Sequence, residues 1–340
     1  MPFSFWNWLS NDIAIDLGTC NTLVYVKGRG ILVREPSMVA VRKPDHRIIA
    51  IGTAAREMMG KTHRDIEVIR PMRDGVIDDD EVAEMMIRAF IRKVQKNRLM
   101  RPRVIVCIPS GATTSEKRII RDAAEHAGAR EVHLIAEPMA AALGVGLPVT
   151  DPIGSMVIDV GGGTTEIAVI SLSGIVTENS VRIAGDEIDQ CIVQFMRRSY
   201  NLLIGERTGE EIKMRIGSAV ELEEELSIVA KGRDLVAGIP RAIEINSIEI
   251  REAIAEPVSQ IVDAVKVALE KTPPELAADI RDRGIILTGG GALLRGLEAR
   301  LREETSLPVI LAEDPLTCVV RGTGKVLDDF ETYQSVLLKS

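Results

Sequence analysis

The segment that decides the fold lies near the middle of the chain and reads Val157-Ile158-Asp159-Val160-Gly161-Gly162-Gly163-Thr164-Thr165-Glu166-Ile167-Ala168-Val169. Two apolar runs flank three glycines, which predicts a strand, a turn and a second strand. Glycines let backbone N–H groups approach an anion, and the threonines add hydroxyl donors. An acid such as Asp159 is costly to bury unless it faces a cation or a solvated cleft. The segment therefore predicts a metal–phosphate site.

The same pattern occurs once more near the N-terminus, in Ile13-Ala14-Ile15-Asp16-Leu17-Gly18-Thr19-Cys20-Asn21-Thr22-Leu23-Val24-Tyr25. Each copy has an apolar strand, an acid, a glycine turn with a threonine, and another apolar strand. A single turn of this kind would be interpreted as an ordinary β-hairpin. Two copies almost half a chain apart predict two lobes that face one ligand.

The composition is that of a soluble globular protein. With 340 residues, 46% hydrophobic and 27% charged, the chain is long enough for two domains with a large core. The formal net charge of −8 argues against a protein whose main task is to neutralise nucleic-acid phosphates, so no nucleic-acid partner is expected. The four cysteines and four histidines show neither a zinc-ligand spacing nor a disulfide framework.

The first ten residues contain both tryptophans of the chain and two of its five phenylalanines. This segment is far shorter than the roughly 20 apolar residues that span a bilayer, and it has no basic start like that of a signal peptide. In a helix, Phe5, Trp8 and Leu9 would share one face with Trp6 beside Phe5, which suits an amphipathic helix in a membrane interface. A hydrophobic tail packed against the body is the alternative.

A second candidate membrane contact is a basic segment with an apolar tip. No acidic residue occurs between Met85 and Ser115, whereas six basic residues surround Leu99-Met100. Each Lys or Arg near an anionic leaflet contributes about 1 kcal/mol to binding, although a solvated run of charge would have the same composition. The predicted membrane contacts are Phe3, Phe5, Trp6, Trp8, Leu9, Leu99 and Met100.

Two further motifs could contribute to a site. Glu137 follows an apolar strand and precedes a helix begun by Pro138, where α/β proteins place catalytic side chains; stabilisation of the helix dipole is the alternative. The cluster Gly289-Gly290-Gly291 suggests a backbone that passes close to a flat or anionic ligand, or simply a tight turn. By contrast, Gly322-Thr323-Gly324-Lys325 lacks the first glycine and the final Ser or Thr of a P-loop.

In this order, the motifs resemble the actin, sugar kinase and seventy-kilodalton heat-shock chaperone ATPase superfamily, and most closely the MreB family of bacterial actins. The resemblance covers nearly the whole chain. It is carried by residues 16–22, 70–77, 108–111, 137–142, 159–166 and 287–296. The family commonly has alanine where this chain has Cys20, which leaves the reactivity of that thiol as an open question.

The resemblance implies an α/β protein with the actin-like ATPase fold. Two duplicated lobes with ribonuclease H-like cores would each carry a small inserted subdomain. The implied parts are a membrane-binding segment (1–10), subdomain IA (11–34, 70–150 and 319–340), subdomain IB (35–69), subdomain IIA (151–190 and 248–318) and subdomain IIB (191–247).

By the same resemblance, ATP and Mg²⁺ would bind between the lobes. Asp16 and Asp159 would hold the hydrated metal, and Glu137 and Thr164 would orient the attacking water in a reaction that mainly needs positioning and electrostatic stabilisation. The implied nucleotide contacts are Thr19, Cys20, Asn21, Gly161, Gly162, Gly163, Glu210, Glu211, Ile212, Lys213, Gly290, Gly291, Ala292 and Leu293.

The implied function is that of a slow Mg²⁺-dependent ATPase whose activity is coupled to polymerisation. A heterologous interface repeated without closure would give paired protofilaments. These would be cytoplasmic, peripheral on the inner face of the cell membrane, and would guide the cell-wall elongation machinery of rod-shaped cells. The alternatives are a plasmid-segregating actin and a small-molecule kinase, for which the sequence shows no clear acceptor site.

Overall fold

The two repeated glycine turns each join an antiparallel pair of strands at the centre of a sheet. The computed structural model describes residues 12–43, 45–95 and 101–338. In the first sheet β1 (Ile13–Leu17) pairs with β2 (Asn21–Val26) in antiparallel register and with β9 (Arg103–Ile108) in parallel register. Strands β3 (Gly30–Pro36) and β10 (Glu131–Ala136) complete the order β10-β9-β1-β2-β3.

The second sheet repeats this topology. Its central hairpin is formed by β11 (Ser155–Val160) and β12 (Thr165–Ser171), which pair in antiparallel register. Strand β13 (Gly174–Val181) flanks β12, and β17 (Ile285–Thr288) and β18 (Val309–Leu311) follow β11 as parallel neighbours, giving the order β13-β12-β11-β17-β18. The two sheets therefore have the same strand directions, as the repeated motif predicts for duplicated lobes.

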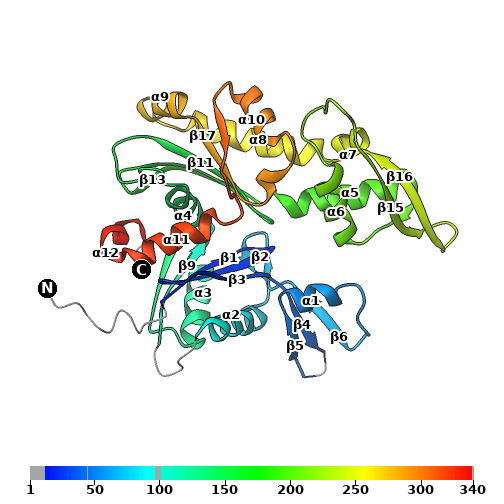
Figure 1. Ribbon diagram of the computed structural model, residues 1–340, viewed down its shortest axis with the longest axis horizontal. Coiled ribbons are helices and arrows are strands. Elements are labelled where there is room, and N and C mark those ends of the chain that lie inside the picture. Colours follow the sequence, from blue (N-terminus) through cyan, green and yellow to red (C-terminus); the bar gives the residue numbers. More distant parts are fainter. Residues whose placement is uncertain (1–11, 44, 96–100, 339–340) are drawn as a thin grey trace.

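Two helices lie between the sheets and join the lobes (Figure 1). They are α4 (Glu137–Gly144) and α11 (Cys318–Asp328). One cluster of buried side chains contains Ala14 of the first sheet, Val157 of the second, and residues of both helices. The remaining helices of the lobes are α2 (Asp80–Val94), α3 (Thr114–His126), α8 (Ala255–Glu270), α9 (Pro274–Arg283), α10 (Leu297–Thr305), α12 (Phe330–Tyr333), η1 (Gly291–Leu293) and η2 (Gln334–Val336).

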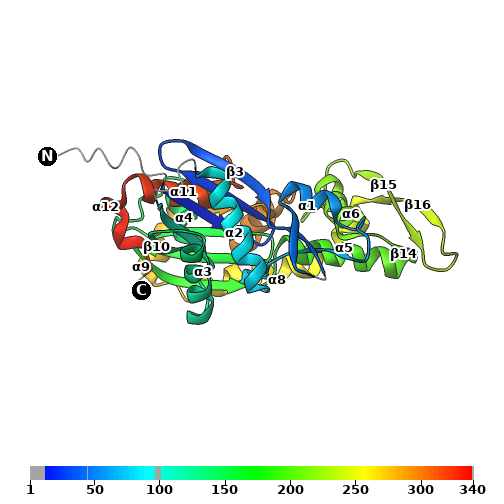
Figure 2. The same cartoon turned by 90° about the horizontal axis from the view of Figure 1, so that it is seen from below.

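Each lobe carries a smaller subdomain, and both lie at the end of the molecule opposite α12 (Figures 1 and 2). The first contains β4 (Val39–Arg42), β5 (Arg47–Ile51), α1 (Thr53–Met58) and β6 (Ile66–Ile69). The second contains β14 (Leu202–Leu203), α6 (Glu206–Ile216), β15 (Ser227–Asp234), β16 (Pro240–Asn246) and α7 (Ser247–Ala253), and α5 (Gly185–Tyr200) leads into it from the large lobe.

The sequence predicts a loop over residues 70–75 and helices over residues 210–217 and about 254–271, and the local structure differs from these expectations. Residues 70–75, expected as a loop, contain β7 (Met72–Arg73), which pairs with β8 (Val76–Ile77). Helix α6 begins at Glu206 rather than at Glu210, and the separate helix α7 precedes α8. The segment Gly322-Thr323-Gly324-Lys325 lies inside α11, which agrees with its rejection as a P-loop.

The predicted membrane contacts fall on residues 1–10 and on Leu99 and Met100, which lie outside the described residues. Within the part of the chain that the structure describes, no helix has the length and apolar character needed to cross a bilayer.

Candidate functional site

The two Asp-x-Gly turns face each other across the boundary between the lobes. A Cβ atom added to Gly162 would overlap the Cys20 side chain, and one added to Gly163 would lie 2.8 Å from Cα of Asp74. The backbone N–H of Gly75 donates to Oγ1 of Thr19 at 3.1 Å. Glycine is required at Gly162 and Gly163 because the backbone of the second turn passes against Cys20, Thr19 and Asp74 of the other lobe.

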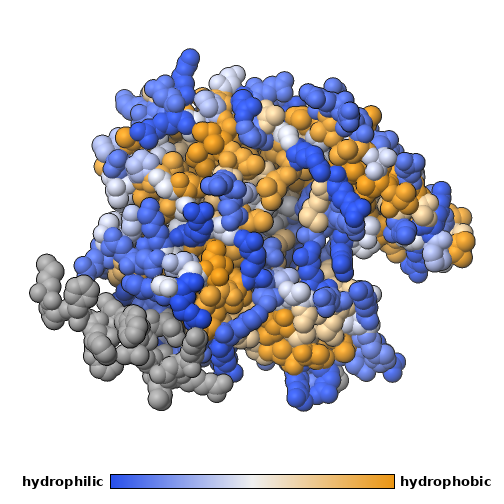
Figure 3. All heavy atoms as spheres, in the orientation of Figure 1, coloured by the Kyte–Doolittle hydropathy of each residue, from blue (hydrophilic) through white to orange (hydrophobic). Residues whose placement is uncertain are grey.

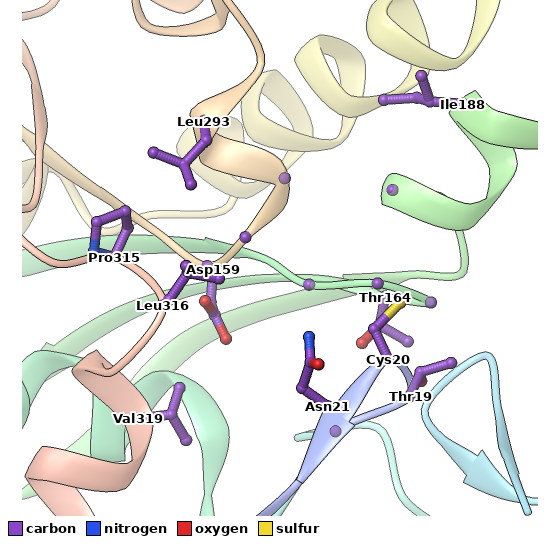
Figure 4. A pocket seen from close by; sticks show the side chains of 18 of the residues that line it. Thr19, Cys20, Asn21, Asp159, Thr164, Ile188, Leu293, Pro315, Leu316 and Val319 are labelled. Carbon is purple, nitrogen blue, oxygen red and sulfur yellow. The ribbon is translucent and has the colours of Figure 1, made fainter. Parts of the chain in front are cut away.

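A cavity of about 300 Å³ lies between these turns. In Figure 4, Asn21 and Asp159 point into the same space from the two lobes. The structure brings together at this cavity most residues of the predicted site, namely Asp16, Thr19, Cys20, Asn21, Glu137, Asp159, Gly161, Gly162, Gly163, Thr164, Glu210, Lys213, Gly290, Gly291 and Leu293.

Three carboxylic acids line the inner end of the cavity. Burial, and next the charge of Asp159, raise the pKa of Asp16 from 3.8 to about 8. Burial raises the pKa of Asp159 to about 6, although the hydroxyl of Thr288 donates to its Oδ1 at 3.0 Å and acts in the opposite direction. The pKa of Glu137 is raised well above its usual value by burial, and then by Glu166, Asp16 and Asp159.

Two of these acids could take part in holding a hydrated divalent cation, although the described residues contain no group of three or more His, Cys, Asp or Glu placed to bind one directly. Among the described ion pairs none involves these three carboxylates, so their mutual repulsion is not offset by a neighbouring Lys or Arg. Oxygen ligands are the ones that Mg²⁺ prefers, and Mg²⁺ usually keeps several waters while binding one or two carboxylates. Asp16 and Asp159 are the pair that could hold such an ion.

The raised pKa values predict how the stability of the protein without nucleotide and divalent cation changes with pH. An acid whose folded-state pKa is raised stabilises the fold fully below its unfolded pKa, and this contribution is lost as the pH rises through the folded value. For Asp16 that window extends from 3.8 to about 8. We expect the thermal midpoint in EDTA to fall between pH 5 and pH 8, as measured by differential scanning fluorimetry.

The Asp16→Asn variant provides the control, because its side chain cannot ionise. Its thermal midpoint should fall less steeply over the same pH range. Equal slopes for this variant and the unmodified protein would contradict the assignment of the effect to Asp16.

Thr164 and Glu166 connect the second turn to the first lobe. The side chain of Thr164 is buried and packs against Gly75. The fully buried carboxylate of Glu166 accepts hydrogen bonds from the backbone N–H (3.2 Å) and hydroxyl (2.5 Å) of Ser110, and from the hydroxyl of Ser180 (2.6 Å). Because Ser110 follows β9 of the first sheet and Ser180 lies on β13 of the second, Glu166 ties the two lobes together beside Glu137.

The outer end of the cavity is apolar. Met214, Leu293 and Leu316 line it while remaining 61%, 52% and 40% exposed, and Figure 4 shows Leu293, Pro315 and Leu316 on the same side of the space. Large apolar side chains left exposed at a concave surface favour contact with a flat apolar group of a ligand.

Three of the predicted contacts do not line the cavity. Ile212 is buried in the core of the second lobe, Glu211 is exposed and pairs with Arg215 at 3.0 Å, and Ala292 is buried in the same core as Ile212. The prediction treated 210–213 as one contact surface, but successive helical residues point about 100° apart. Only residues three or four apart, such as Glu210, Lys213 and Met214, share the face that lines the cavity.

Glu210 also takes part in contacts that close the cleft at its outer side. Its Oε2 accepts a hydrogen bond from Nη2 of Arg56 at 2.5 Å, which joins the two small subdomains. Arg70 lies within 3.4 Å of Asp186 and 3.3 Å of Glu206. These residues line a second cavity of about 670 Å³, where the space-filling surface is notched between the small subdomains (Figure 3).

The thiol of Cys20 is held in its protonated form. Its Sγ donates to Oδ1 of Asp186 at 3.1 Å. Burial, followed by the charge of Asp186, raises the pKa of Cys20 above its usual range. Since the thiolate is the reactive form of cysteine, this environment suits a structural rather than a reactive thiol.

Sequence reasoning missed several residues of the cavity. Asp189, Met214 and Leu316 line it, yet none of them belongs to a glycine motif. Helical spacing could have indicated two of them. Asp189 lies four residues after Gly185, which contacts the Gly161–Gly163 turn. Met214 lies four residues after Glu210 and therefore shares its helix face.

Comparisons with known proteins agree with this geometry. The model of the MreB/Mbl protein family matches residues 10–335. The chain is 56% identical over 335 residues to the cell shape-determining protein MreB of Escherichia coli (strain K12), covering 97% of this chain and 96% of that protein. It is 49% identical over 323 residues to the cell shape-determining protein Mbl of Bacillus subtilis (strain 168), covering 95% and 97% of the two chains.

Several solved structures are similar to this chain over most of its length. MreB5 of Spiroplasma citri bound to ADP superposes with a TM-score of 0.90 at 40% identity, covering 94% of this chain and 97% of that one. The same protein has also been solved bound to AMPPNP, with a TM-score of 0.90. The MamK double helical filament, at 21% identity and a TM-score of 0.80 over 94% of this chain and 99% of that one, shares the actin-like fold.

Proposed function

Because this chain belongs to the MreB/Mbl protein family, we propose that it is a cytoskeletal ATPase that polymerises on the inner face of the cell membrane. The observation that carries the proposal is the cavity between the duplicated lobes, where two glycine turns meet beside Asp16 and the buried acids Glu137 and Asp159. The printed names of its relatives describe cell shape-determining proteins, and MreB5 binds ADP and AMPPNP. We extend these properties to this chain.

The residues of the cavity divide into three roles. Backbone N–H groups of Thr19 to Asn21 and Gly161 to Gly163 hold the phosphates, as glycine turns do for anions. Asp16 and Asp159 would hold Mg²⁺, which would neutralise part of the charge on the phosphates. Glu137 accepts a proton from the attacking water, and Thr164 positions that water.

The apolar end of the cavity completes a nucleotide site. Leu293, Met214 and Leu316 offer exposed apolar surface for the base. Glu210 lines the cavity and also pairs with Arg56 of the other small subdomain. Nucleotide exchange therefore requires this contact between the subdomains to loosen, and this links the state of the nucleotide to the relative position of the lobes.

Membrane binding rests on the sequence alone. The aromatic segment at residues 1–10 would bury a few large side chains, each worth about 1.5–3 kcal/mol when fully buried, less the cost of ordering the segment. One molecule would bind weakly, but many copies joined in a filament would bind firmly through avidity. A filament lying on the membrane can guide the cell-wall elongation machinery along its length.

Electron microscopy on an anionic lipid monolayer tests the proposal, because it reports filament formation and membrane attachment together. We expect filaments on the monolayer with ATP and Mg²⁺, and few without nucleotide. Filaments that form in solution but do not bind the lipid monolayer would favour a plasmid-segregating actin. Phosphate transfer that depends on an added small-molecule acceptor would favour a kinase.

A specific variant tests the predicted membrane contacts. Deletion of residues 1–9 combined with Leu99→Ser and Met100→Ser should abolish cosedimentation with anionic liposomes, because the apolar groups that enter the interface are removed. Leu172→Ser is the matched control, since Leu172 is 67% exposed on the turn between β12 and β13. Unchanged liposome binding of the deletion variant would show that the membrane assignment is wrong.

A further inference from the structure

The fully buried carboxylate of Glu166 lies next to the cavity, and the proposed function assigns it no role. Glu166 is on β12, is 0% exposed, and is not among the residues that line the cavity. Its hydrogen bonds come from two serines, and in the described part of the chain no Lys or Arg pairs with it. A buried carboxylate without a cation lowers stability, so its presence at this place points to a role in function.

Glu166 belongs to a row of polar side chains that crosses the second sheet. Strand pairing places Thr288, Asp159, Glu166 and Ser180 opposite one another on β17, β11, β12 and β13. The hydroxyl of Thr288 donates to Oδ1 of Asp159 at 3.0 Å, and the hydroxyl of Ser180 donates to Oε1 of Glu166 at 2.6 Å. Paired residues project from the same face of a sheet. The row therefore leads from Asp159 in the cavity to the edge strand of the second lobe.

At this edge the row is completed by Ser110, which belongs to the first lobe. Ser110 follows β9, and it donates to Oε2 of Glu166 through its hydroxyl at 2.5 Å and its backbone N–H at 3.2 Å. A Cβ atom added to the next residue, Gly111, would lie 3.5 Å from the side chain of Ser180. Glu166 thus holds the loop after β9 against the second sheet.

The loop that carries Ser110 leaves the first sheet directly beside Glu137. Strands β9 and β10 are parallel neighbours, and Ile108 is paired with Ala136. Ile108 leads into Pro109 and Ser110, whereas Ala136 leads into Glu137. Movement of this loop would therefore disturb the strand end that fixes Glu137.

On its other side the same loop packs against the turn between β7 and β8, which contacts Thr164. A Cβ atom added to Gly75 in this turn would lie 3.0 Å from Cγ of Pro109 and 2.7 Å from Cγ2 of Thr164. Glu137 belongs to the first lobe and Thr164 to the second, so their separation depends on how the lobes are held together here. The hydrogen bonds of the loop to Glu166 hold the lobes at this place.

We propose that Glu166 is a positioning residue for hydrolysis of the bound nucleotide: by holding Ser110, it keeps Glu137 and Thr164 at the separation that the attacking water requires. This inference rests on the proposed function, since it requires a nucleotide that is hydrolysed in the cavity. Phosphoryl transfer depends mainly on positioning, and a small misplacement of the reacting groups lowers the rate strongly. Because neither Glu166 nor Ser110 lines the cavity, their contact should affect the rate of hydrolysis and leave the affinity for ATP unchanged.

The test compares phosphate release and ATP affinity of Ser110→Ala, Ser110→Thr and the unmodified full chain with Mg²⁺. Ser110→Ala removes the hydroxyl donor that crosses between the lobes, and its kcat should fall about tenfold, as expected for loss of a hydrogen bond to a charged group. Its Kd for ATP, measured by displacement of a fluorescent analogue, should not change. Ser110→Thr keeps a hydroxyl and should retain most of the rate. Rates are compared per amount of sedimented protein, because hydrolysis is coupled to polymerisation in the proposed function.

The variants leave Glu166 in place, because burial and then the charge of Glu166 raise the pKa of Glu137. Ser180→Ala is the matched control: it removes a donor from the same buried carboxylate, but within one lobe. Its thermal midpoint should fall about as much as that of Ser110→Ala, while its kcat should stay near that of the unmodified protein.

Three results would overturn the inference. They are a normal kcat for Ser110→Ala, an equal loss of kcat in Ser110→Ala and Ser180→Ala, and a rate loss in Ser110→Ala that its weaker binding of ATP explains. In each case the unmodified protein would still hydrolyse ATP, and the proposed function would stand. If the unmodified protein neither bound nor hydrolysed ATP, the proposed function would fail together with the inference.

Discussion

The Glu137→Gln variant should bind ATP as the unmodified protein does and release phosphate about a hundredfold more slowly, within the range that a general base contributes. Glutamine has nearly the same shape and can still accept a hydrogen bond through its carbonyl oxygen. It cannot take up the proton of the attacking water. The change therefore separates proton transfer from nucleotide binding.

The structure gives two reasons to expect this large effect at Glu137. It is the first residue of α4 and directly follows β10, so both a strand end and a buried helix fix its position. Burial and then the charges of Glu166, Asp16 and Asp159 raise its pKa well above the usual value. A carboxylate with a raised pKa is a stronger base in its ionised form.

The measurement pairs phosphate release with nucleotide affinity and with sedimentation of filaments. Glu131→Gln is the matched control, because Glu131 lies at the other end of β10 and pairs with Arg103 and His133. The control should hydrolyse ATP normally. A Glu137→Gln variant with normal phosphate release would remove Glu137 from the reaction, whereas one that had lost ATP affinity would show that Glu137 mainly shapes the site.

Local sequence motifs predicted the parts of the site that follow directly from strands. An acid at the end of an apolar strand followed by glycines has few possible structures. The sequence around Asp16 and Asp159 was therefore enough to predict that these acids and the glycine turns line one site. Glu137 could be assigned for a similar reason, because Pro138 begins a helix at the end of a strand. The repetition of the Asp-x-Gly motif was sufficient to predict two lobes of one topology, which the two sheets confirm.

The parts contributed by helices could be predicted only in part. In the 210–213 run, Glu211 and Ile212 point away from the cavity because the side chains rotate around the helix axis, while Met214 was missed just beyond the run. Asp189 carries no motif, and it comes to line the cavity together with Lys213, which lies 24 residues further along the chain. Likewise, the contact between Arg56 and Glu210 depends on how the lobes close, which no local pattern specifies.

The glycines of α11 are another helical feature whose structural reason could not be predicted from the sequence. Sequence spacing was enough to reject 322–325 as a P-loop, but it could not explain why a helix should contain glycine. In the structure α11 crosses α4 with backbones in contact: a Cβ atom added to Gly322 would overlap the carbonyl oxygen of Ala140, and one added to Gly144 would overlap that of Cys318. This crossing lies within the cluster of buried side chains that joins the two sheets.

Gly322→Ala should therefore be the most destabilising of the substitutions considered for this chain. In an ordinary helix interior, alanine is more favourable than glycine by about 1 kcal/mol. Here the added methyl group must push the two helices apart, and we expect a net loss of at least about 3 kcal/mol, at the upper end of the cost of overpacking a core. Helix propensity alone would make Gly322→Ala stabilising. A loss of stability would therefore indicate the close contact between α4 and α11.

Thermal unfolding and soluble yield measure the effect of Gly322→Ala, and ATP affinity measures its consequence for the site. Because α4 begins at Glu137 and α11 contributes Val319 to the cavity wall, separating the helices should also weaken nucleotide binding in any protein that remains folded. Gly174→Ala is the matched control: Gly174 is exposed at the start of β13, and an added Cβ would meet only the carbonyl oxygen of Ser171 at 3.7 Å. Its unfolding free energy should change by no more than about 0.5 kcal/mol. A Gly322→Ala protein as stable as this control would contradict the backbone contact between α4 and α11, and with it the view that this crossing holds the lobes in register around the site.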